Sequence, residues 1–368
     1  MSAPAARAGG ITAPADAADR PVLFVTGHVP AYRVDALARL HEREGLEVAQ
    51  FGGSRRHGGP DAAGRLPFPA RRAGPRELYA LAASGRYRAV VVPTGGRAAL
   101  LASWAGARAG HVPVILWASL WAHPRTPAHV LSYLPLRRLY RSAEAVVTYG
   151  PHVSAYVRGR GAVNVFEAPQ AVDNEFWSAA DLPEPQLAGW PQGGATRFLF
   201  VGRAAREKGV AVLRDAWGLA GPPAGCELVL VGTHASDGGH ALGALSPEQL
   251  REVYAHVDVL VVPSIPTASF REPWGLVVNE AMNQGVAVIA SDAVGAAAGG
   301  LVCDGDTGIV VPAGDARALA GAIVRLAGSA ELRARLGTAG GRAVAAYTTD
   351  AWAAAFSLAL QSAGVAAR

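Results

Sequence analysis

Short apolar segments alternate with amphipathic ones along the chain, and this alternation restricts the possible folds more than any other feature. Residues 21–26 form a continuous apolar run, residues 34–44 carry apolar side chains at helical spacing, and residues 46–51 form a second strand-like run after Gly45. A continuous apolar run is typical of a strand that is buried on both faces of a parallel sheet. Strand, helix and strand in this order predict a βαβ unit, the building block of a doubly wound α/β fold.

The alternation continues through most of the chain. With 368 residues the chain is too long for one typical compact core, and its 51% of hydrophobic residues suffice for two, so we predict two α/β domains. Residues 52–76 are rich in Gly, Pro and Arg without any period and are interpreted as a mobile loop. Further strands are expected in residues 88–93, 112–117, 143–148, 198–201, 227–232 and 257–264.

Composition and charge argue against several classes of protein. The formal net charge is +5, but the arginines are scattered without a nucleic-acid-binding motif, so nucleic acid is not an expected partner. Cys226 and Cys303 lack metal-site spacing and predict no disulfide framework, which fits a cytoplasmic protein. Residues 1–20 contain no apolar run and predict a disordered tail rather than a signal peptide, and no segment has the apolar length of a membrane span.

Two glutamates frame the stretch from residue 270 to residue 280, which reads FREPWGLVVNE. Glu272 precedes a Pro-Trp-Gly turn, and Glu280 lies in the following apolar run, which predicts a helix. A loop that leads into a helix N-terminus presents free backbone N–H groups, which attract an anion such as phosphate. Glu272 would then contact sugar hydroxyls at the rim of that site, and Glu280 would hold a ribose diol. The alternative is an ordinary loop with two solvated glutamates.

The same stretch resembles the E-x7-E motif of retaining glycosyltransferases of the GT-B fold, family 4 in particular. The resemblance extends upstream to residues 197–209 (RFLFVGRAAREKG) and downstream to residues 281–292 and 304–315. It is specific over about residues 196–340 and weaker over the first half of the chain. It implies the GT-B architecture, in which two Rossmann-like doubly wound domains face each other across a cleft.

The resemblance also implies domain limits. Residues 21–177 would form an N-terminal acceptor-binding domain, residues 178–195 a linker, and residues 196–349 a C-terminal donor-binding domain. Residues 168–176 (APQAVDNEF) resemble the family segment that ends the first domain. Residues 350–368 would form a last helix that crosses back to the N-terminal domain.

On the donor side, cationic residues and glycines follow the predicted strands. The resemblance implies that Arg203 and Lys208 neutralise the charge that develops on a leaving diphosphate, usually without a divalent metal. The alternative for this pair is a surface arginine and a capping lysine. We expect no metal and no cofactor beyond the nucleotide-sugar co-substrate. The expected donor-binding residues are Gly202, Arg203, Lys208, Gly232, Thr233, Glu272, Trp274, Gly275, Leu276 and Glu280.

On the acceptor side, the expected residues come from loops that follow strands of the first domain. Many family members have paired glycines after the first strand, whereas this chain has Gly27 alone, followed by a Pro-x-Tyr-Arg segment. A neutral histidine after residues 112–117 would accept or position an acceptor proton at physiological pH, and the alternative is simple loop packing. The expected acceptor-binding residues are Gly27, Tyr32, Arg33 and His123. The expected catalytic residues are Glu272, His123, Arg203 and Lys208.

Residues 126–141 combine apolar and basic side chains and allow two interpretations. Such a helix either attaches to a membrane surface or packs with its apolar side on its own sheet. Because Pro135 interrupts the pattern, packing on the sheet is the favoured interpretation. The apolar side chains predicted on one side of the helix are Val130, Leu131, Leu134 and Leu139.

The expected reaction is transfer of a hexosyl unit from a nucleotide-diphosphate sugar, with retention of the anomeric configuration, to a small-molecule acceptor. The usual retaining scheme needs a carboxylate nucleophile beside the anomeric carbon. The resemblance instead implies a front-face substitution, in which the leaving phosphate oxygen takes the acceptor proton. A lipid-linked or polysaccharide acceptor is one alternative. The others are an enzyme that epimerises or hydrolyses nucleotide sugars and a non-catalytic nucleotide-sugar binder. The oligomeric state stays open.

Overall fold

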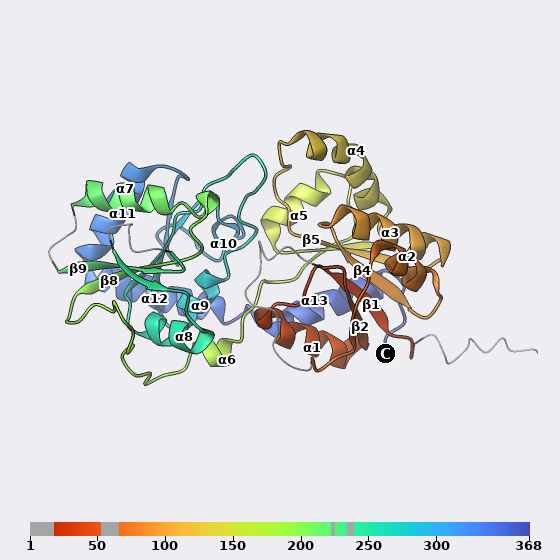
Figure 1. Ribbon diagram of the computed structural model, residues 1–368, viewed down its shortest axis with the longest axis horizontal. Helices are drawn as coiled ribbons and strands as arrows, with labels where there is room; N and C mark the ends of the chain where they lie inside the picture. The colour runs from red at the N-terminus through yellow and green to blue at the C-terminus, as the bar shows by residue number, and fades with distance from the viewer. Residues whose placement is uncertain (1–17, 53–65, 222–224, 234–238) are drawn as a thin grey trace, which may run out of the picture.

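The computed structural model describes residues 18–52, 66–221, 225–233 and 239–368. These residues form two lobes, each built around its own parallel sheet, which lie side by side along the long axis of the molecule (Figure 1). Most of the predicted tail and the middle of the predicted loop after residue 52 lie outside the described residues.

The N-terminal lobe contains a doubly wound parallel sheet. Among the described residues its strand order is β3-β2-β1-β4-β5-β6-β7, and each neighbouring pair is parallel. The order reverses between β1 and β4, so the loops at the carboxyl ends of these two strands diverge and leave a crevice where such sheets bind ligands. The strands are β1 (Val22–Thr26), β2 (Leu46–Gln50), β3 (Ala70–Arg72), β4 (Ala89–Pro93), β5 (Val114–Ala118), β6 (Ala145–Thr148) and β7 (Val165–Glu167).

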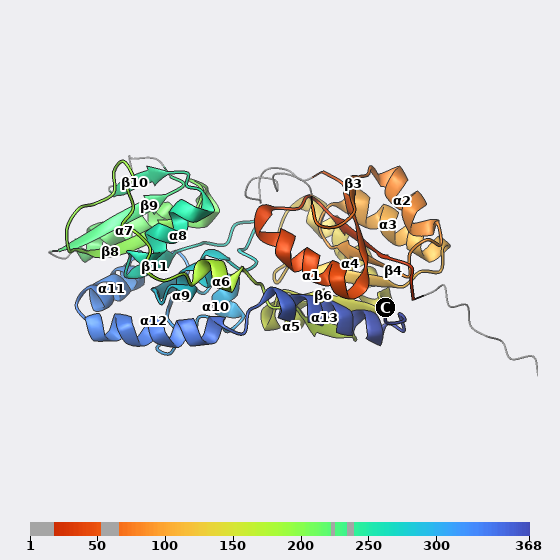
Figure 2. The same ribbon diagram turned by 90° about the horizontal axis from the view of Figure 1, so that it is seen from below.

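Helices cover both faces of this sheet (Figures 1 and 2). On one face α1 (Val34–Glu44) and α13 (Thr349–Ser362) pack, and the short helix η1 (Ala31–Arg33) leads into α1. The helices on the other face are α2 (Pro75–Ala83), α3 (Arg97–Ala109), α4 (Pro127–Ser142) and α5 (Pro151–Arg158).

The C-terminal lobe repeats this plan. Within the described residues its strand order is β10-β9-β8-β11-β12-β13, all parallel, and the order reverses between β8 and β11. The strands are β8 (Thr196–Val201), β9 (Cys226–Val231), β10 (His240–Gly243), β11 (Val259–Val262), β12 (Ala287–Ser291) and β13 (Ile309–Val311). The helices are α6 (Asn174–Trp177) before the lobe, then η2 (Arg206–Lys208), α7 (Val210–Ala220), α8 (Pro247–Ala255), α9 (Val277–Asn283), α10 (Gly295–Ala298), α11 (Ala316–Ala327) and α12 (Ala330–Val344).

The predicted α/β fold class is confirmed, and its cause is visible in the first unit of the chain. All five residues of β1 are buried, as expected for a strand with helices on both faces. Helix α1 begins at Val34, and Gly45 ends it by donating its N–H to the His41 carbonyl. The hydrophobic pattern and the glycine therefore predicted both ends of this helix correctly.

The prediction of a mobile loop over residues 52–76 is wrong at its C-terminal end. Strand β3 pairs with β2, with Val48 opposite Ala70, and α2 starts at Pro75. The three side chains of β3 are exposed, so this edge strand is held by backbone hydrogen bonds and carries no apolar pattern that could be read in the sequence. Residues 53–65 lie outside the described residues.

The last helix, α13, belongs spatially to the N-terminal lobe although the C-terminal lobe precedes it in the chain (Figure 2). Trp352 is completely buried and contacts Phe24 of β1, with ring centroids 6.3 Å apart. Phe356 packs against the same ring at 5.7 Å. The chain therefore crosses between the lobes twice, once near α6 and once before α13.

The favoured interpretation of residues 126–141 needs a correction. Helix α4 runs through Pro135 without a break, and Leu136 and Tyr140 pack into the core. Of the four apolar residues expected to pack on the sheet, only Leu139 is buried. The other three face solvent because the buried side of α4 is rotated away from the predicted stripe.

Candidate active site

A cavity of about 1800 Å³ lies between the two lobes. Loops at the carboxyl ends of β1, β4 and β5 line it on the N-terminal side, and loops after β8, β9 and β11 line it on the other. Both sheets thus present their point of strand reversal to the same space. Pockets for one small ligand usually measure roughly 300–1,000 Å³, so this cleft has room for a donor and an acceptor together.

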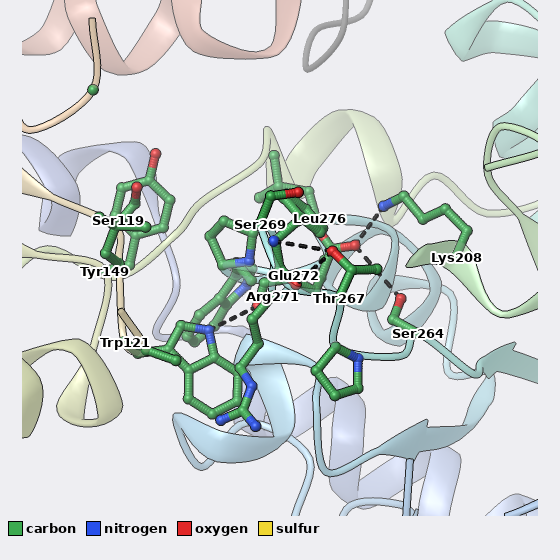
Figure 3. Close-up of a pocket in the computed structure, with 18 of the residues that line it drawn as sticks. Ser119, Trp121, Tyr149, Lys208, Ser264, Thr267, Ser269, Arg271, Glu272 and Leu276 are labelled. Carbon is green, nitrogen blue, oxygen red and sulfur yellow. Dashed lines mark hydrogen bonds and ion pairs between the residues drawn. The ribbon is translucent and has the colours of Figure 1, made fainter. Parts of the chain in front are cut away.

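Glu272 and Lys208 meet on the C-terminal wall of this cleft (Figure 3). Lys208 is the only lysine of the chain, and its Nζ lies 2.5 Å from Glu272 Oε2. The Glu272 side chain is 9% exposed and that of Lys208 is 24% exposed, so solvent screens the pair only weakly. Ser264 Oγ lies 3.5 Å from the same carboxylate oxygen. The ligand-free protein therefore neutralises this carboxylate with a cation.

The loop that carries Glu272, residues 264–276 and hereafter the Glu272 loop, is held by its own backbone. The Thr267 N–H donates to the Phe270 carbonyl at 2.8 Å, and Thr267 Oγ1 accepts from the Phe270 N–H at 3.1 Å. The Glu272 carbonyl accepts from the Gly295 N–H at 3.1 Å. These bonds fix the carboxylate before any ligand enters, which lowers the entropic cost of binding.

Two side chains of the N-terminal lobe also contact the Glu272 loop. Trp121 Nε1 donates to the Glu272 carbonyl at 3.1 Å, and the Arg271 guanidinium lies over the Trp121 ring at 4.4 Å (Figure 3). His152 Nε2 lies 3.0 Å from the Pro273 carbonyl. Burial lowers the pKa of His152, so at neutral pH a neutral ring donates this bond. The loop is therefore shared between the lobes.

Two glycines form the turn at the ends of β8 and β9. Gly232 has φ 82°, and a Cβ on it would lie 2.6 Å from the Gly202 carbonyl, so no other residue fits there without a shift of the backbone. Both glycines line the cleft. This close approach leaves open space in front of the cationic residues that follow β8.

Three cationic side chains line that part of the cleft: Arg203, Arg206 and Lys208. The Arg203 side chain is 54% exposed, and its guanidinium lies 3.5 Å from Glu207 Oε1. Arg203 therefore stands at the mouth of the cleft, whereas Lys208 stands on its wall. Cations arranged in this way attract a multiply charged anion such as a diphosphate.

Glu280 lines the cleft from α9. Tyr254 Oη donates to Glu280 Oε2 at 3.0 Å. Burial raises the pKa of Glu280 to about 7, and the Tyr254 hydrogen bond offsets only part of that rise. Near neutral pH this carboxyl group exists in both protonation states, and either state forms hydrogen bonds with a diol.

The segment before α9 supplies backbone donors. Trp274, Gly275 and Leu276 line the cleft, and in the part of the chain that the structure describes their N–H groups donate to no acceptor. The Trp274 ring is buried, and its Nε1 donates to Asn279 Oδ1 at 2.7 Å. The ring therefore anchors the turn beside the cavity.

Arg33 is buried on the N-terminal side of the cleft. Its Nη2 donates to Gln170 Oε1 at 2.8 Å, and its guanidinium lies over the rings of Trp117 and Trp352 at 5.3 and 5.4 Å. The Gln170 carbonyl in turn accepts from Asn279 Nδ2 at 2.7 Å. Arg33 is thus neither solvated nor isolated, since Gln170 connects it to α9 of the other lobe.

His123 and Tyr32 line the cleft on the same side. His123 Nδ1 lies 3.1 Å from Tyr156 Oη, and the His123 ring meets Tyr133 edge-on with centroids 5.1 Å apart. These contacts from α4 and α5 set the orientation of the imidazole. The structure brings His123 to the cleft as predicted from its place after β5, and its chemical role stays a prediction.

Gly27 and Thr233 are not among the residues that line the cleft, so the structure does not bring these two predicted residues to it. After Gly27 the Val29 N–H donates to Gln50 Oε1 at 3.2 Å, which turns this part of the loop toward β2. The loop therefore reaches the cavity only at Tyr32 and Arg33. Thr233 is 4% exposed and directly precedes residues 234–238, which lie outside the described residues.

Several lining or supporting residues were not predicted from the sequence. Trp121 and Ser264 follow β5 and β11, so their position after a strand was a usable signal. Tyr254 and Gln170 gave no signal, because their partners on α9 lie 26 and 109 positions away in the chain.

The described residues contain neither a cluster suited to a metal ion nor a helix suited to span a membrane. No group of three or more His, Cys, Asp or Glu side chains there is placed to hold a metal ion. None of the helices described is long and apolar enough to cross a bilayer. Cys226 and Cys303 are free thiols. The cytoplasmic location and the independence from metal stay predictions.

Comparison with known proteins identifies the lobe that carries the Lys208–Glu272 pair. Its sequence matches the family described as "Glycosyl transferases group 1" over residues 195–329. Over 194 residues the chain is 36% identical to the phosphatidyl-myo-inositol mannosyltransferase of Mycobacterium leprae (strain TN), an alignment that covers 49% of each protein. The chain thus spans about half the length of the curated relatives it matches.

Solved structures extend the likeness from the group 1 segment to nearly the whole chain. The HepE protein of Anabaena in complex with UDP and glucose superposes with a TM-score of 0.72 and 17% identity, over 93% of this chain and 100% of that one. Sucrose-phosphate synthase from Thermosynechococcus elongatus superposes with a TM-score of 0.69 and 20% identity, over 93% and 98%. At such identities the likeness establishes the fold. The chain has the GT-B fold that the E-x7-E resemblance implied.

Proposed function

We propose that this protein is a retaining glycosyltransferase that moves a hexosyl unit from a nucleotide-diphosphate sugar to an acceptor bound across the cleft. The observation that carries the proposal is the Lys208–Glu272 pair on the wall of a cavity large enough for two substrates. The match of residues 195–329 to the glycosyl transferases group 1 family supports it. The Anabaena neighbour, solved with UDP and glucose, supports a nucleotide donor.

The donor diphosphate would lie between Lys208, Arg203 and the amides of Gly275 and Leu276. All four residues line the same cavity, and the two side chains supply positive charge where the leaving group gains negative charge. Arginine offers a planar fork and lysine a point charge, so the two groups reach different phosphate oxygens. Glu280 would accept from or donate to the ribose diol.

The chemistry proposed is a front-face substitution. The bond between the anomeric carbon and the leaving phosphate oxygen breaks, and the diphosphate keeps the electron pair. The acceptor hydroxyl oxygen bonds to the anomeric carbon from the same face, and its proton passes to the leaving phosphate oxygen. Glu272 is a poor candidate for a nucleophile because Lys208 already neutralises it. Its carboxylate would orient the sugar hydroxyls instead, and His123 would position the acceptor hydroxyl.

The proposal has two versions, which differ in the class of acceptor. A small molecule is the acceptor expected from the sequence, and the cleft has the volume for one beside the donor. A lipid-linked acceptor is supported by the curated relatives, two mycobacterial proteins described as phosphatidyl-myo-inositol mannosyltransferases. The relatives favour the lipid-linked version.

A ligand screen followed by calorimetry tests the donor part of the proposal. Thermal-shift measurements with UDP-, GDP-, ADP- and TDP-sugars should show one nucleotide that raises the melting temperature, because a ligand at about 100 times its Kd stabilises the native state by about 2.7 kcal/mol. Titration calorimetry with that nucleotide should give no measurable binding for Lys208→Ala and wild-type affinity for Arg317→Ala, an exposed cation on α11. Equal affinity of Lys208→Ala and wild type would remove the assignment.

Two further measurements separate the alternatives. Turnover of the selected nucleotide sugar without any acceptor would indicate a hydrolase or an epimerase, and binding without turnover under any condition would indicate a non-catalytic binder. Because Arg203 and Lys208 take the place of a divalent cation in the proposal, transfer should continue at an unchanged rate in EDTA. Loss of activity that Mg²⁺ or Mn²⁺ restores would contradict this part.

A further inference from the structure

One side of α4 is exposed and divides into an apolar half and a cationic half. Val130, Leu131 and Leu134 are 64%, 81% and 68% exposed. Arg138 and Arg141 follow on the next turns and are exposed as well. With about 3.6 residues per turn, these five positions lie on one side of the helix, and we call them the α4 face. Large aliphatic side chains exposed together on one helix mark a surface that contacts something apolar.

Positive charge is concentrated in the segment of the chain that contains this face. Residues 120–160 contain six arginines and one acidic residue, Glu144, an excess equal to the formal net charge of +5 of the whole chain. Glu144 is already engaged, because it lies 2.7 Å from Arg108 Nη1 and accepts from the Val114 N–H. Helix α4 itself contains no Asp or Glu. Six arginines thus fall in one stretch of the sequence, which runs from the loop after β5 through α4 to just past the end of α5.

The opposite side of α4 lines the cleft. Ser132, Leu136 and Leu139 border the cavity, while the helix lies at the periphery of the N-terminal lobe (Figure 1). Leu101 of α3 lines the same cavity and is 50% exposed, so an apolar rim continues from the α4 face toward the opening. A surface that touched the α4 face would therefore lie beside the N-terminal mouth of the cleft.

We propose that the α4 face docks on the surface of an anionic phospholipid bilayer. The aliphatic side chains would enter the boundary between headgroups and acyl chains, and Arg138 and Arg141 would contact lipid phosphates, as in helices that lie in the plane of a membrane. A second copy of this chain is a poorer occupant, because a twofold contact would bring the same cations of both copies together. An anionic lipid surface complements both halves of the face at once.

Docking in this orientation specifies the acceptor, and this step rests on the proposed function. The bilayer would present lipid headgroups at the mouth of the cleft, next to His123 and Tyr32, with the acyl chains left in the membrane. The acceptor class is then a lipid with a hydroxylated headgroup. A soluble acceptor would gain nothing from this surface.

Vesicle binding by the full chain tests the docking. Sedimentation with vesicles of phosphatidylcholine alone is compared with an equimolar mixture of phosphatidylcholine and phosphatidylglycerol. Leu131→Gln with Leu134→Gln should reduce the partition coefficient on the mixed vesicles at least ~10-fold, since each loses the burial of a large aliphatic side chain. Arg138→Gln with Arg141→Gln should reduce it roughly fivefold per arginine and should weaken the salt dependence.

The matched controls are Leu219→Gln on α7 and Leu358→Gln on α13, whose side chains are 58% and 54% exposed in other parts of the surface. Both should partition like wild type, and all variants should keep wild-type nucleotide affinity. Equal binding to both kinds of vesicle, an equal loss in the controls, or dimerisation that depends on Leu131 and Leu134 would overturn the proposal. If the protein binds anionic vesicles through the α4 face but turns over no nucleotide sugar, the proposed function is wrong and the proposed docking surface is still supported.

Discussion

At the scale of single residues, the ligand-free cleft pairs two of its donor-side cations with carboxylates. Lys208 contacts Glu272, and Arg203 contacts Glu207. A diphosphate that enters the cleft has to share these cations with the carboxylates already there. The pairs therefore hold the cations in position, and in the proposed reaction they would limit how tightly the product nucleotide binds.

Replacement of Glu272 by Gln should change binding and turnover in opposite directions. The variant keeps the shape of the side chain but frees Lys208 and removes a negative charge beside the diphosphate, so affinity for the bare nucleotide should rise roughly 3- to 10-fold, about 1 kcal/mol. Transfer should fall because the sugar hydroxyls lose a charged acceptor. Titration calorimetry and a transfer assay on the same preparation measure both. A parallel loss of nucleotide affinity would mean that Glu272 supports the diphosphate site rather than the sugar.

Glu280 should make the stability of the protein depend on pH. Its pKa is about 7 in the folded protein against about 4.5 as the ordinary value, so the folded state holds its proton between these pH values and the unfolded state does not. The free energy of unfolding therefore falls as the pH rises through this window. Glu280→Gln has no ionisable group at this position. Its free energy of unfolding should therefore exceed that of the wild type by on the order of 1–3 kcal/mol between about pH 5 and about pH 8.

Urea denaturation at several pH values measures this difference, and Tyr254→Phe is the informative companion. The Tyr254 hydroxyl donates to the carboxylate, so its removal should raise the pKa of Glu280 further and extend the loss of stability to higher pH, while the lower end of the window stays near the unfolded pKa. A constant difference between Glu280→Gln and wild type across the range would show that the carboxyl group is not buried as described.

In the candidate site, the residues that could be predicted from the sequence are those that belong to a local sequence motif. Glu272, Glu280 and Lys208 stand at fixed spacing from the turns and strands that position them, so a pattern in the sequence could find them. Gln170 and Asn279 could not be found in this way. Their hydrogen bond joins the Asn279 side chain to the Gln170 main-chain carbonyl across 109 positions, so no spacing within either segment indicates the pairing.

At the scale of elements, the cleft depends on how η2 turns into α7. Gly209 lies between the two helices with φ 71°, and a Cβ on it would overlap the Pro263 carbonyl after β11. This packing sets where Lys208, one position earlier, leaves the backbone. The turn therefore links the position of Lys208 in the cleft to the geometry of the sheet.

Two glycines in and beside α7 should respond in opposite ways to alanine. Gly209→Ala should destabilise the protein by ~2 kcal/mol or more, since both the left-handed backbone and the nearby carbonyl oppose a side chain. Gly218→Ala lies in the exposed last turns of α7 with nothing within 4 Å of its new Cβ. It should stabilise the protein by about 0.5–1 kcal/mol through helix propensity. Urea denaturation of both variants checks the signs, and destabilisation by both would contradict the account of the turn.

Elements with a strong apolar period could be predicted closely, and elements held by other forces could not. Helix α1 begins at the predicted Val34 because its buried face and Gly45 act locally. Strand β3 is an exposed edge strand that depends on backbone pairing with β2. In α4 the sequence contains two candidate apolar stripes, and only the packing of Leu136, Leu139 and Tyr140 decides which one is buried.

At the scale of the whole molecule, the C-terminal end of the chain completes the N-terminal core. Trp352 and Phe356 of α13 share one aromatic cluster with Phe24 and Trp117. The lobe that would bind the acceptor is therefore not finished until the donor lobe has been synthesised. The two crossings of the chain also tie the lobes together.

Trp352→Ala should destabilise the N-terminal lobe by roughly 3–5 kcal/mol, the usual cost of removing a fully buried tryptophan. Leu358→Ala is the matched control, since this residue lies on the solvent side of the same helix and should change stability by less than about 0.5 kcal/mol. Hydrogen exchange measured by mass spectrometry should show the loss of protection in β1 and α1 but not in β8 and β11. Uniform loss over both lobes would mean that they unfold as one unit.

The proposed active site requires that Lys208 contacts a diphosphate. A reagent that modifies amines can test this contact, because the chain contains one lysine. Lys208 is the only lysine, so reductive methylation labels only its Nζ and the N-terminal amine, which serves as the internal reference. With the nucleoside diphosphate selected by the ligand screen at saturation, labelling of Lys208 should slow strongly while the N-terminal amine reacts at an unchanged rate. If Lys208 reacts equally fast with and without the bound nucleotide, the diphosphate lies elsewhere and the proposed active site is wrong.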